Sequence, residues 1–370
     1  MTIESEKNHT RRWLGRTPHL RAIWKRLCSN VYVTRNLDDC RPTTARRCSP
    51  SNDACCRVGS SAGDNVMAIS ACKIGHVTFA TPDVRRLAEH YTDIVGLAVS
   101  AEEKDQVVLS TSLGEEALVL VKAAVPGLTH LSLQLSPNSS TEEVVRHLRE
   151  LGLSAEVKSD VTPGITRLVE FEDPAGRVVQ LFTESRLCEP KQAPHGVVPL
   201  KLGHVAFMVP SALGMVEFYT RVLGFKVSDW LLNTFAFLRC GPDHHTVNFM
   251  SGDENRLHHV AFELKDWSHI QSACDYLGRR KKKIIWGPGR HGIGHNIFIY
   301  YRDDDDNIVE FYTELDQMKS EALGYFEPRP WHQDFPQRPK VWERLPAGLT
   351  WGTPPTEDFL RSHFQKTYTA

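Results

Sequence analysis

Short segments with alternating apolar and polar residues recur along the chain, and turn residues separate them. Each alternating segment is followed by a stretch with helical spacing, which ends near Gly96, Gly152, Gly224 or Gly278. Apolar runs rich in β-branched and aromatic residues then complete each unit. The pattern predicts a strand, a helix and roughly three more strands, four times over. Each opening strand carries a histidine: 73–79, 129–133, 201–207 and 258–262.

The four units form two longer repeats. The sequence of residues 73–79 returns at 201–207, and that of residues 179–184 returns at 309–314. Repeats of this length predict two homologous domains, which we place at 67–190 and 198–318. We therefore expect an α+β protein with two tandem domains, in each of which two βαβββ units curl into a half-open barrel.

The two ends of the chain differ from this repeat. Residues 1–66 hold twelve Lys or Arg against six Asp or Glu, with little apolar periodicity, which predicts a disordered basic extension. Residues 319–370 are rich in proline and tryptophan, which is typical of an extended arm. We expect the aromatic residues of this arm to dock on the body of the protein or on a neighbouring subunit.

Composition and net charge limit the kinds of partner that we expect this protein to bind. The 370 residues carry a net charge of −1, so no excess charge attracts a polyanion, and we expect no nucleic-acid partner. No apolar run approaches the roughly 20 residues that cross a bilayer, and no secretory signal follows the N-terminus. These features predict a soluble, cytoplasmic protein without a membrane partner.

The two repeats differ at one chemically important position. The second domain carries His204, His259 and Glu310 at places where the first carries His76, His130 and Gln180. Two imidazoles and a carboxylate suit an iron(II) site with open coordination positions, whereas a neutral amide is a weaker ligand. We expect the metal in the second domain and a structural role for the first.

The second domain resembles the type I extradiol ring-cleavage dioxygenases, or metapyrocatechases, of the vicinal oxygen chelate superfamily. The most specific stretch is Gly289-Arg290-His291, seven residues, Ile299-Tyr300, two residues, Asp303 and then Glu310. The resemblance extends over about residues 73–315. One departure is the acidic run 303–306, where the first domain has Asp173-Pro174-Ala175-Gly176. We expect a solvated turn there, with Asp or Asn in a left-handed conformation, rather than a calcium site.

The resemblance implies a role for each of several residues. His204, His259 and Glu310 match the iron(II) ligands, and His244 matches the catalytic acid-base histidine. His291 and Tyr300 match the pair that hydrogen-bonds the substrate oxygens, and Asn248 stands on the substrate side, at the place that matches Glu310 within the preceding unit. A shift of one residue would exchange His244 for His245, or His259 for His258. Strand alternation favours the first assignment, because such a shift sends a side chain to the opposite face.

The implied activity is iron(II)-dependent extradiol cleavage of catechol or a substituted catechol with O₂, giving a 2-hydroxymuconic semialdehyde-type product. Mn(II) can replace Fe(II) in the same ligand set, and homo-oligomers are usual in the family. Two alternatives are a metal-dependent glyoxalase-like isomerase or thiol transferase and a non-catalytic ligand-binding relative. Several catechol rings are compatible with the sequence. We expect the substrate pocket to have an apolar wall formed by Trp230, Leu231, Leu232, Phe235 and Phe237.

Overall fold

The structure is a computed structural model that describes residues 69–137, 139–189, 195–327, 338–343 and 349–361. The predicted basic extension, residues 1–66, lies outside the described residues. Among the described residues, none of the helices has the length and apolar character needed to cross a membrane.

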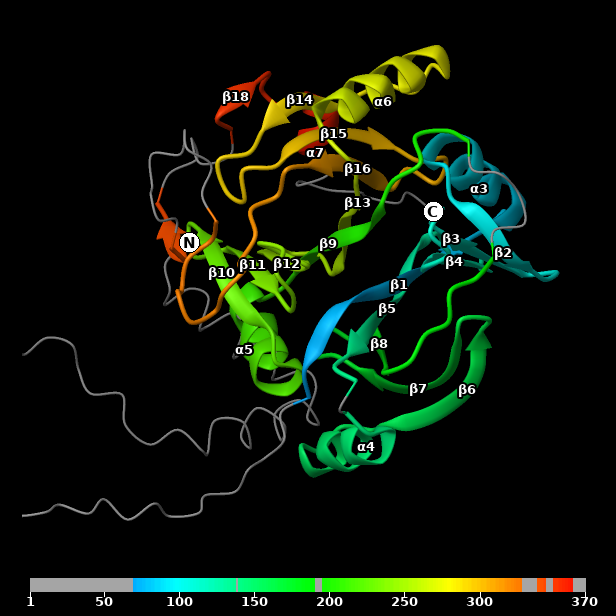
Figure 1. Ribbon diagram of the computed structural model, residues 1–370, viewed down its shortest axis with the longest axis vertical. Coiled ribbons are helices and arrows are strands. Elements are labelled where there is room, and N and C mark those ends of the chain that lie inside the picture. Colours follow the sequence, from blue (N-terminus) through cyan, green and yellow to red (C-terminus); the bar gives the residue numbers. More distant parts are fainter. Residues whose placement is uncertain (1–68, 138, 190–194, 328–337, 344–348, 362–370) are drawn as a thin grey trace, which may run out of the picture.

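The first half of the chain forms an eight-stranded mixed sheet with the order β2-β3-β4-β1-β5-β8-β7-β6. The sheet curls strongly, and its helices lie outside the curl (Figure 1). Its elements are β1 (Ala71–Thr81), α3 (Val84–His90), the π-helix η1 (Tyr91–Val95), β2 (Ala98–Glu102), β3 (Gln106–Ser110), β4 (Glu116–Lys122), β5 (Gly127–Leu135), α4 (Thr141–Glu150), β6 (Glu156–Thr162), β7 (Ile165–Glu172) and β8 (Val178–Phe182).

The second half forms a ten-stranded sheet with the order β17-β10-β11-β12-β9-β13-β16-β15-β14-β18. Its core elements repeat those of the first sheet in the same order. They are β9 (Lys201–Val209), α5 (Ala212–Leu223), β10 (Lys226–Leu231), β11 (Phe235–Arg239), β12 (Val247–Ser251), β13 (Arg256–Glu263), α6 (Trp267–Arg279), β14 (Trp286–Arg290), β15 (Ile297–Arg302) and β16 (Ile308–Thr313). The predicted succession of strand, helix and three strands, four times over, is confirmed, and so is the α+β fold.

Local sequence explains where the helices begin and end. Asp83, Ser211 and Asp266 accept hydrogen bonds from backbone N–H groups of the first turns of α3, α5 and α6. The expected glycine ends are found at Gly96 and Gly224, which have φ values of 88° and 74°. Gly278 differs, because α6 continues through it to Arg279.

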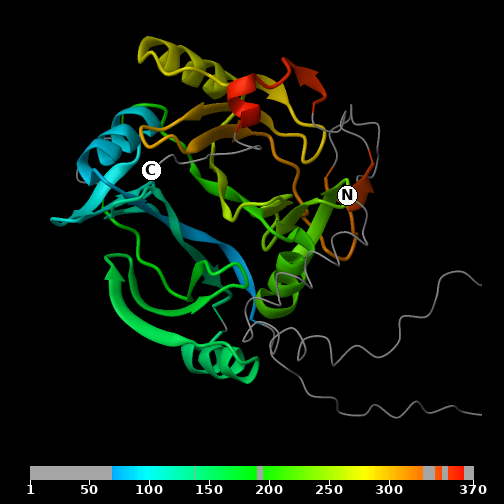
Figure 2. The ribbon, with the colours of Figure 1, turned by 180° about the vertical axis from the view of Figure 1, so that it is seen from behind.

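The C-terminal elements complete the second sheet. They are β17 (Lys340–Trp342), which pairs with β10, β18 (Trp351–Gly352), which pairs with β14, and α7 (Glu357–Arg361). Seen from behind, α7 lies against the orange strands of this sheet (Figure 2). Its Phe359 packs on Trp286 and Tyr300, with ring centroids 4.6 and 5.0 Å apart.

The two halves contact each other through matching hydrogen bonds. Tyr91 donates to Asp303 in the turn between β15 and β16, and Tyr219 donates to Asp173 in the equivalent turn of the first sheet. The acidic run 303–306 keeps the turn, because Asp306 has a φ of 68° where Gly176 has 75°. Its side chains have protein partners, among them Lys282 for Asp304 and Arg86 for Asp305.

Candidate metal centre and substrate pocket

Three ligand-type side chains meet inside the second sheet. One potential ligand atom from each of His204, His259 and Glu310 lies within 4.8 Å of the others, and all three side chains are buried. The Nε2 atom of His204 lies 3.0 Å and that of His259 3.2 Å from the same Glu310 oxygen, Oε2. The His259 contact does not have hydrogen-bond geometry, and Nε2 of His259 has no hydrogen-bond partner.

Strand pairing explains this convergence. Strands β9 and β13 are antiparallel, so the histidine of each lies beside the centre of the other, with His204 opposite Ala261 and His259 opposite Ala206. Glu310 on β16 also pairs with Ala261, which places its carboxylate between the two imidazoles. Asn248 on β12 pairs with Ala206. The register therefore confirms that Asn248 and Glu310 occupy matching places in successive units.

Glycine makes room for the first ligand. A side chain at Gly203 would meet the Tyr312 hydroxyl at 1.8 Å, so only glycine lets Tyr312 lie against the strand. The ring of Tyr312 packs on His204 with centroids 4.9 Å apart. The repeated Gly-His pair therefore lets a large ring approach the histidine.

Electrostatics favours an ionised carboxylate at this centre. Burial raises the pKa of Glu310, but the charge and hydrogen bond of His204, with a further interaction from His259, hold it well below its usual range. Asn296 donates a hydrogen bond to the other oxygen, Oε1, at 3.0 Å. Burial lowers the pKa of His259. The result is one anionic and two imidazole ligands, the set that suits a divalent transition metal with open positions.

A cavity of about 1010 Å³ opens on the centre. His204, His259 and Glu310 line it together with the predicted residues Asn248, His291 and Tyr300. His291 Nε2 lies 3.1 Å from the Tyr300 hydroxyl, and the His291 ring stacks on Phe298 with centroids 3.8 Å apart. The Oδ1 atom of Asn248 is buried without a hydrogen-bond partner. Polar groups thus gather at the metal-centre end of this cavity.

The structure places His245, rather than the predicted His244, at the cavity. His244 is fully buried and does not line the cavity, whereas His245 lines it and packs on His204 with ring centroids 4.3 Å apart. Both histidines precede β12, which begins at Val247. Strand alternation therefore does not apply to them, and the place that the sequence assigns to His244 belongs to His245.

The side chain of His258 also departs from the regular alternation of side chains along a strand. The register between β13 and β9 shifts between Leu257 and His259, so the strand bulges at His258. A bulge re-aims side chains, and His258 and His259 both line the cavity. His258 Nδ1 lies 2.7 Å from His259 Nδ1, so it orients the ring that faces Glu310.

The apolar wall is broader than the sequence suggests. Leu231, Leu232, Phe235 and Phe237 line the cavity as expected, whereas Trp230 does not. The excess of aromatic residues near the C-terminus was the only sequence signal for the wall that α7 adds. The apolar lining residues that the sequence analysis did not name are Met208, Met250, Trp286, Ile293, Pro355, Phe359 and Leu360.

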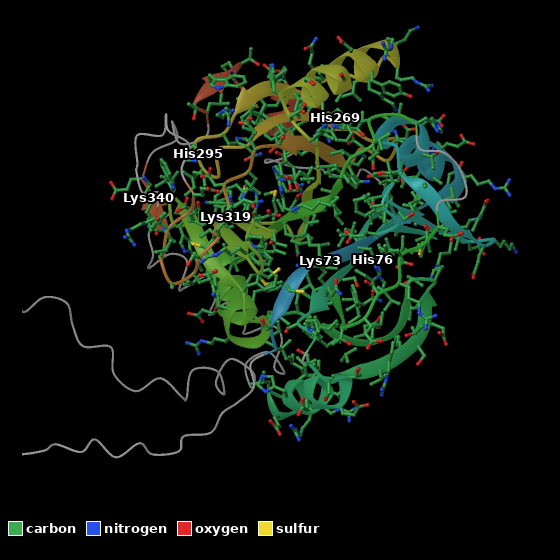
Figure 3. The ribbon with its side chains drawn as sticks, in the orientation of Figure 1. Lys73, His76, His269, His295, Lys319 and Lys340 are labelled. Atoms are coloured by element: carbon green, nitrogen blue, oxygen red, sulfur yellow. The ribbon has the colours of Figure 1, made fainter. Side chains whose placement is uncertain are left out.

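The first half does not reproduce the centre. His76 is buried at the equivalent place, in the other half of the molecule from His295 (Figure 3). The Gln180 amide donates to Glu170 at 3.1 Å, and His130 lies 2.8 Å from the Thr129 hydroxyl. Within the described residues, the only convergent group of at least three His, Cys, Asp or Glu is the one in the second half.

Comparison with known proteins agrees with this architecture. Residues 201–311 match the Glyoxalase/Bleomycin resistance protein/Dioxygenase superfamily. The metapyrocatechase of Pseudomonas sp. strain CF600 is 24% identical over 259 residues, which are 64% of this chain and 84% of that protein. These matches confirm the resemblance drawn from the sequence.

Solved structures have the same fold. Native homoprotocatechuate 2,3-dioxygenase from Arthrobacter globiformis aligns with a TM-score of 0.67 and 23% identity, covering 82% of this chain and 93% of that chain. The Mn(II)-bound glyoxalase from Novosphingobium aromaticivorans aligns with a TM-score of 0.66 and 24% identity, covering 78% and 94%. The second half of the chain is therefore similar to the Glyoxalase/Bleomycin resistance protein/Dioxygenase superfamily, and its relatives include extradiol dioxygenases, a class of oxidoreductases.

Proposed function

We propose that this chain is an iron(II)-dependent extradiol dioxygenase that cleaves catechol or a substituted catechol with O₂, giving a 2-hydroxymuconic semialdehyde-type product. One observation supports this most strongly: two imidazoles and a carboxylate converge at one end of a largely apolar cavity, with His245, His291 and Tyr300 beside them. Mn(II) fits the same ligand set, so the proposal includes it as a second metal.

His204, His259 and Glu310 would hold the metal on one side. An iron(II) ion there would supply the redox step that spin-paired catechol and triplet oxygen need, by binding both reactants and passing electron density between them. Asn248, at the place that matches Glu310, offers a neutral amide instead of a fourth strong ligand. The donor set therefore leaves positions for substrate.

Tyr300 and His291 bind and orient the diol. Burial, with the nearby charge of Glu310, raises the pKa of Tyr300 well above its usual value, so its hydroxyl stays protonated and donates. His291 lies 3.1 Å from that hydroxyl and extends the polar edge of the cavity. The pair gives a hydroxylated ring one preferred orientation in an otherwise apolar space.

His245 manages protons in this proposal, in place of His244. Burial, followed by the charges of His204, His244, His259 and His291, lowers the pKa of His245 well below its usual value. A neutral imidazole has one bare nitrogen and can accept a proton from a substrate hydroxyl. Its contact with His204 keeps it beside the reacting groups.

The first half, residues 67–190, serves a structural role in the proposal. Gln180 replaces the carboxylate ligand there, and its amide is engaged by Glu170. The second half, residues 198–318, holds the reaction. The arm, residues 319–370, closes one side of the cavity through Phe359 and Leu360. Homo-oligomeric assembly belongs to the proposal as well.

Anaerobic loading tests this function directly. Protein loaded with iron(II) and given catechol, then air, should form a yellow ring-fission product and consume one equivalent of O₂ for each catechol. The matched control is zinc-loaded protein, which lacks the redox step and should form no product. Failure with simple, alkyl-substituted and two-ring catechols at full iron occupancy would contradict the proposal.

The same samples distinguish the proposed dioxygenase from the isomerase alternative. A glyoxalase-like enzyme on this fold would work without oxygen and with a redox-inert metal. Zinc- or manganese-loaded protein should therefore leave a glutathione hemithioacetal of a 2-oxoaldehyde unchanged under nitrogen. Turnover of that substrate would favour the isomerase.

A further inference from the structure

Asp229 on β10 is a buried carboxylate that accepts three hydrogen bonds. Its Oδ1 accepts from the backbone N–H of Lys340 at 2.8 Å, and its Oδ2 accepts from Nε1 of Trp342 at 3.0 Å. Nε2 of His244 lies 3.1 Å from the same Oδ2. Lys340 and Trp342 belong to β17, so the C-terminal arm helps to fix this carboxylate.

His244 connects this carboxylate to the cavity. Its Nδ1 lies 3.0 Å from Nδ1 of His245, and both rings are buried. Phe326 packs on the His244 ring with centroids 4.7 Å apart, and Phe237 packs on His245 with centroids 5.4 Å apart. The chain of contacts therefore runs from Asp229 through His244 to His245, the member of this histidine pair that lines the cavity.

Gly294 lets the loop before β15 lie close to His244 and His245. A Cβ atom at this position would lie 3.2 Å from Nδ1 of His244 and 3.3 Å from Cε1 of His245. The residue also has a φ of 74°, which favours glycine. The loop before β15 thus lies directly against the two histidines and limits their movement.

The partner of each ring nitrogen indicates which tautomer of the two histidines this arrangement favours. An ionised carboxylate only accepts, so Nε2 of His244 carries the proton that faces Asp229. The tautomer of His244 that donates from Nε2 has a bare Nδ1, which accepts a hydrogen bond from Nδ1–H of His245. Nε2 of His245 then keeps its lone pair, and this nitrogen is the one left for a substrate in the cavity.

We propose that Asp229 and His244 are positioning residues that hold His245 in the tautomer with a bare Nε2 toward the cavity. This inference rests on the proposed ring-cleavage function, in which His245 accepts a substrate proton. It extends that function to a carboxylate on β10 and a strand of the C-terminal arm, neither of which lines the cavity.

The first test is kinetic, on iron-loaded full-length protein. His244→Leu removes the acceptor for His245, and we expect kcat to fall roughly 10- to 100-fold, with KM and iron content unchanged. His244→Gln offers both an N–H and a carbonyl oxygen and should restore part of kcat. Asp229→Asn offers one carbonyl oxygen to three donors and should also lower kcat.

A double-mutant cycle separates positioning from loss of structure. Because Asp229 acts through His244, Asp229→Asn should lower kcat little further in a His244→Leu background. The matched control is Asp316→Asn, since Asp316 is a buried carboxylate that lies 2.6 Å from His295 and outside the cavity. We expect that control to lose stability but keep kcat. Wild-type kcat in Asp229→Asn at full iron would overturn the proposal.

The second test does not need turnover. In zinc-loaded protein labelled with ¹⁵N-histidine, the two nitrogens of His245, assigned by their loss in His245→Gln, report which one is protonated. We expect a protonated Nδ1 and a bare Nε2, and loss of this preference in His244→Leu. A proton on Nε2 in the wild type would overturn the proposal even if ring cleavage is observed. Absence of ring cleavage would contradict the proposed function alone.

Discussion

His76 in the first sheet and His204 in the second occupy equivalent positions, but their surroundings differ. His204 faces the Glu310 carboxylate at 3.0 Å, whereas neither ring nitrogen of His76 has a hydrogen-bond partner. The carboxylate nearest to His76 belongs to Glu116, whose Oε2 lies 3.8 Å away. The first centre is therefore buried and polar, but its donors do not converge.

The strand register shows that a glutamate in the first half and a histidine in the second half occupy the same position. Val77 pairs with Leu118 in the first sheet, and Val205 pairs with Val247 in the second. Glu116 and His245 each lie two residues before these partners, so they occupy the same place. The second half therefore has its carboxylate on the last strand of the repeat and its extra histidine before β12. The first half has a carboxylate in the place of that histidine.

We infer from this difference that the position of one carboxylate decides which half can hold a metal. Glu116 already accepts a hydrogen bond from the Gly164 backbone at 2.7 Å, which ties it to the turn between β6 and β7. Glu310 instead lies between two imidazoles. Similar residue types on one fold thus give a polar core in one half and a candidate ligand set in the other.

The largest expected effect comes from making the second centre resemble the first. Glu310→Gln removes the anionic ligand, so we expect metal affinity to fall more than roughly 100-fold and ring cleavage to be lost. Metal content after dialysis and oxygen consumption measure the two effects. The matched control, Glu116→Gln, removes a buried carboxylate from the first half and should keep the metal. Wild-type metal content in Glu310→Gln would show that the ligand set is misassigned.

The next largest effect is expected at His245, which stands where the first half has Glu116. His245→Asn removes the proposed proton acceptor but no metal ligand, so kcat should fall roughly 10²- to 10⁴-fold at unchanged metal content. Single-turnover kinetics at full iron occupancy measure it. His130→Asn, the control in the first half, should turn over normally. Equal activity of His245→Asn and that control would refute the role of His245.

The first centre should instead control acid stability. Burial lowers the pKa of His76 from 6.5 to about 4, so the unfolded chain binds more protons than the folded one between these values. The free energy of unfolding should therefore fall as pH drops through this window, by up to roughly 3 kcal/mol from this residue. His76→Leu should flatten the urea-unfolding profile between pH 7 and pH 4. An unchanged pH slope would contradict the assignment.

The smallest effect comes from giving the first centre a carboxylate on its last strand. Gln180→Glu removes the donor to Glu170 and brings two carboxylates together, which should cost about 1–3 kcal/mol of stability. Thermal unfolding measures this loss, and ring cleavage should stay normal. The exchanged double variant Gln180→Glu with Glu170→Gln restores a donor and should recover stability. No recovery would argue against the pairing.

Much of the fold was predictable because the repeat is visible in the residues. The same apolar pattern and the same Gly-His pair open β1 and β9, and strand pairing follows from that periodicity. The convergence of His204, His259 and Glu310 was predictable for the same reason, since equivalent positions of paired units face one interior.

The choice between adjacent histidines was not predictable from alternation. His244 and His245 lie outside a strand, and a bulge interrupts β13 at His258, so the period of two does not hold at either pair. The contribution of Phe359 to the cavity also depends on long-range packing.

The sequence alone determined the four repeated units, the strands that carry the donor residues and the half that has a glutamate on its last strand, because these depend on local periodicity and residue type. Only the tertiary structure decided that His245 faces the cavity while His244 lies behind it against Asp229. It also decided that α7 covers one side of the cavity. These features depend on contacts between segments that lie far apart in the chain, and no local pattern encodes such contacts.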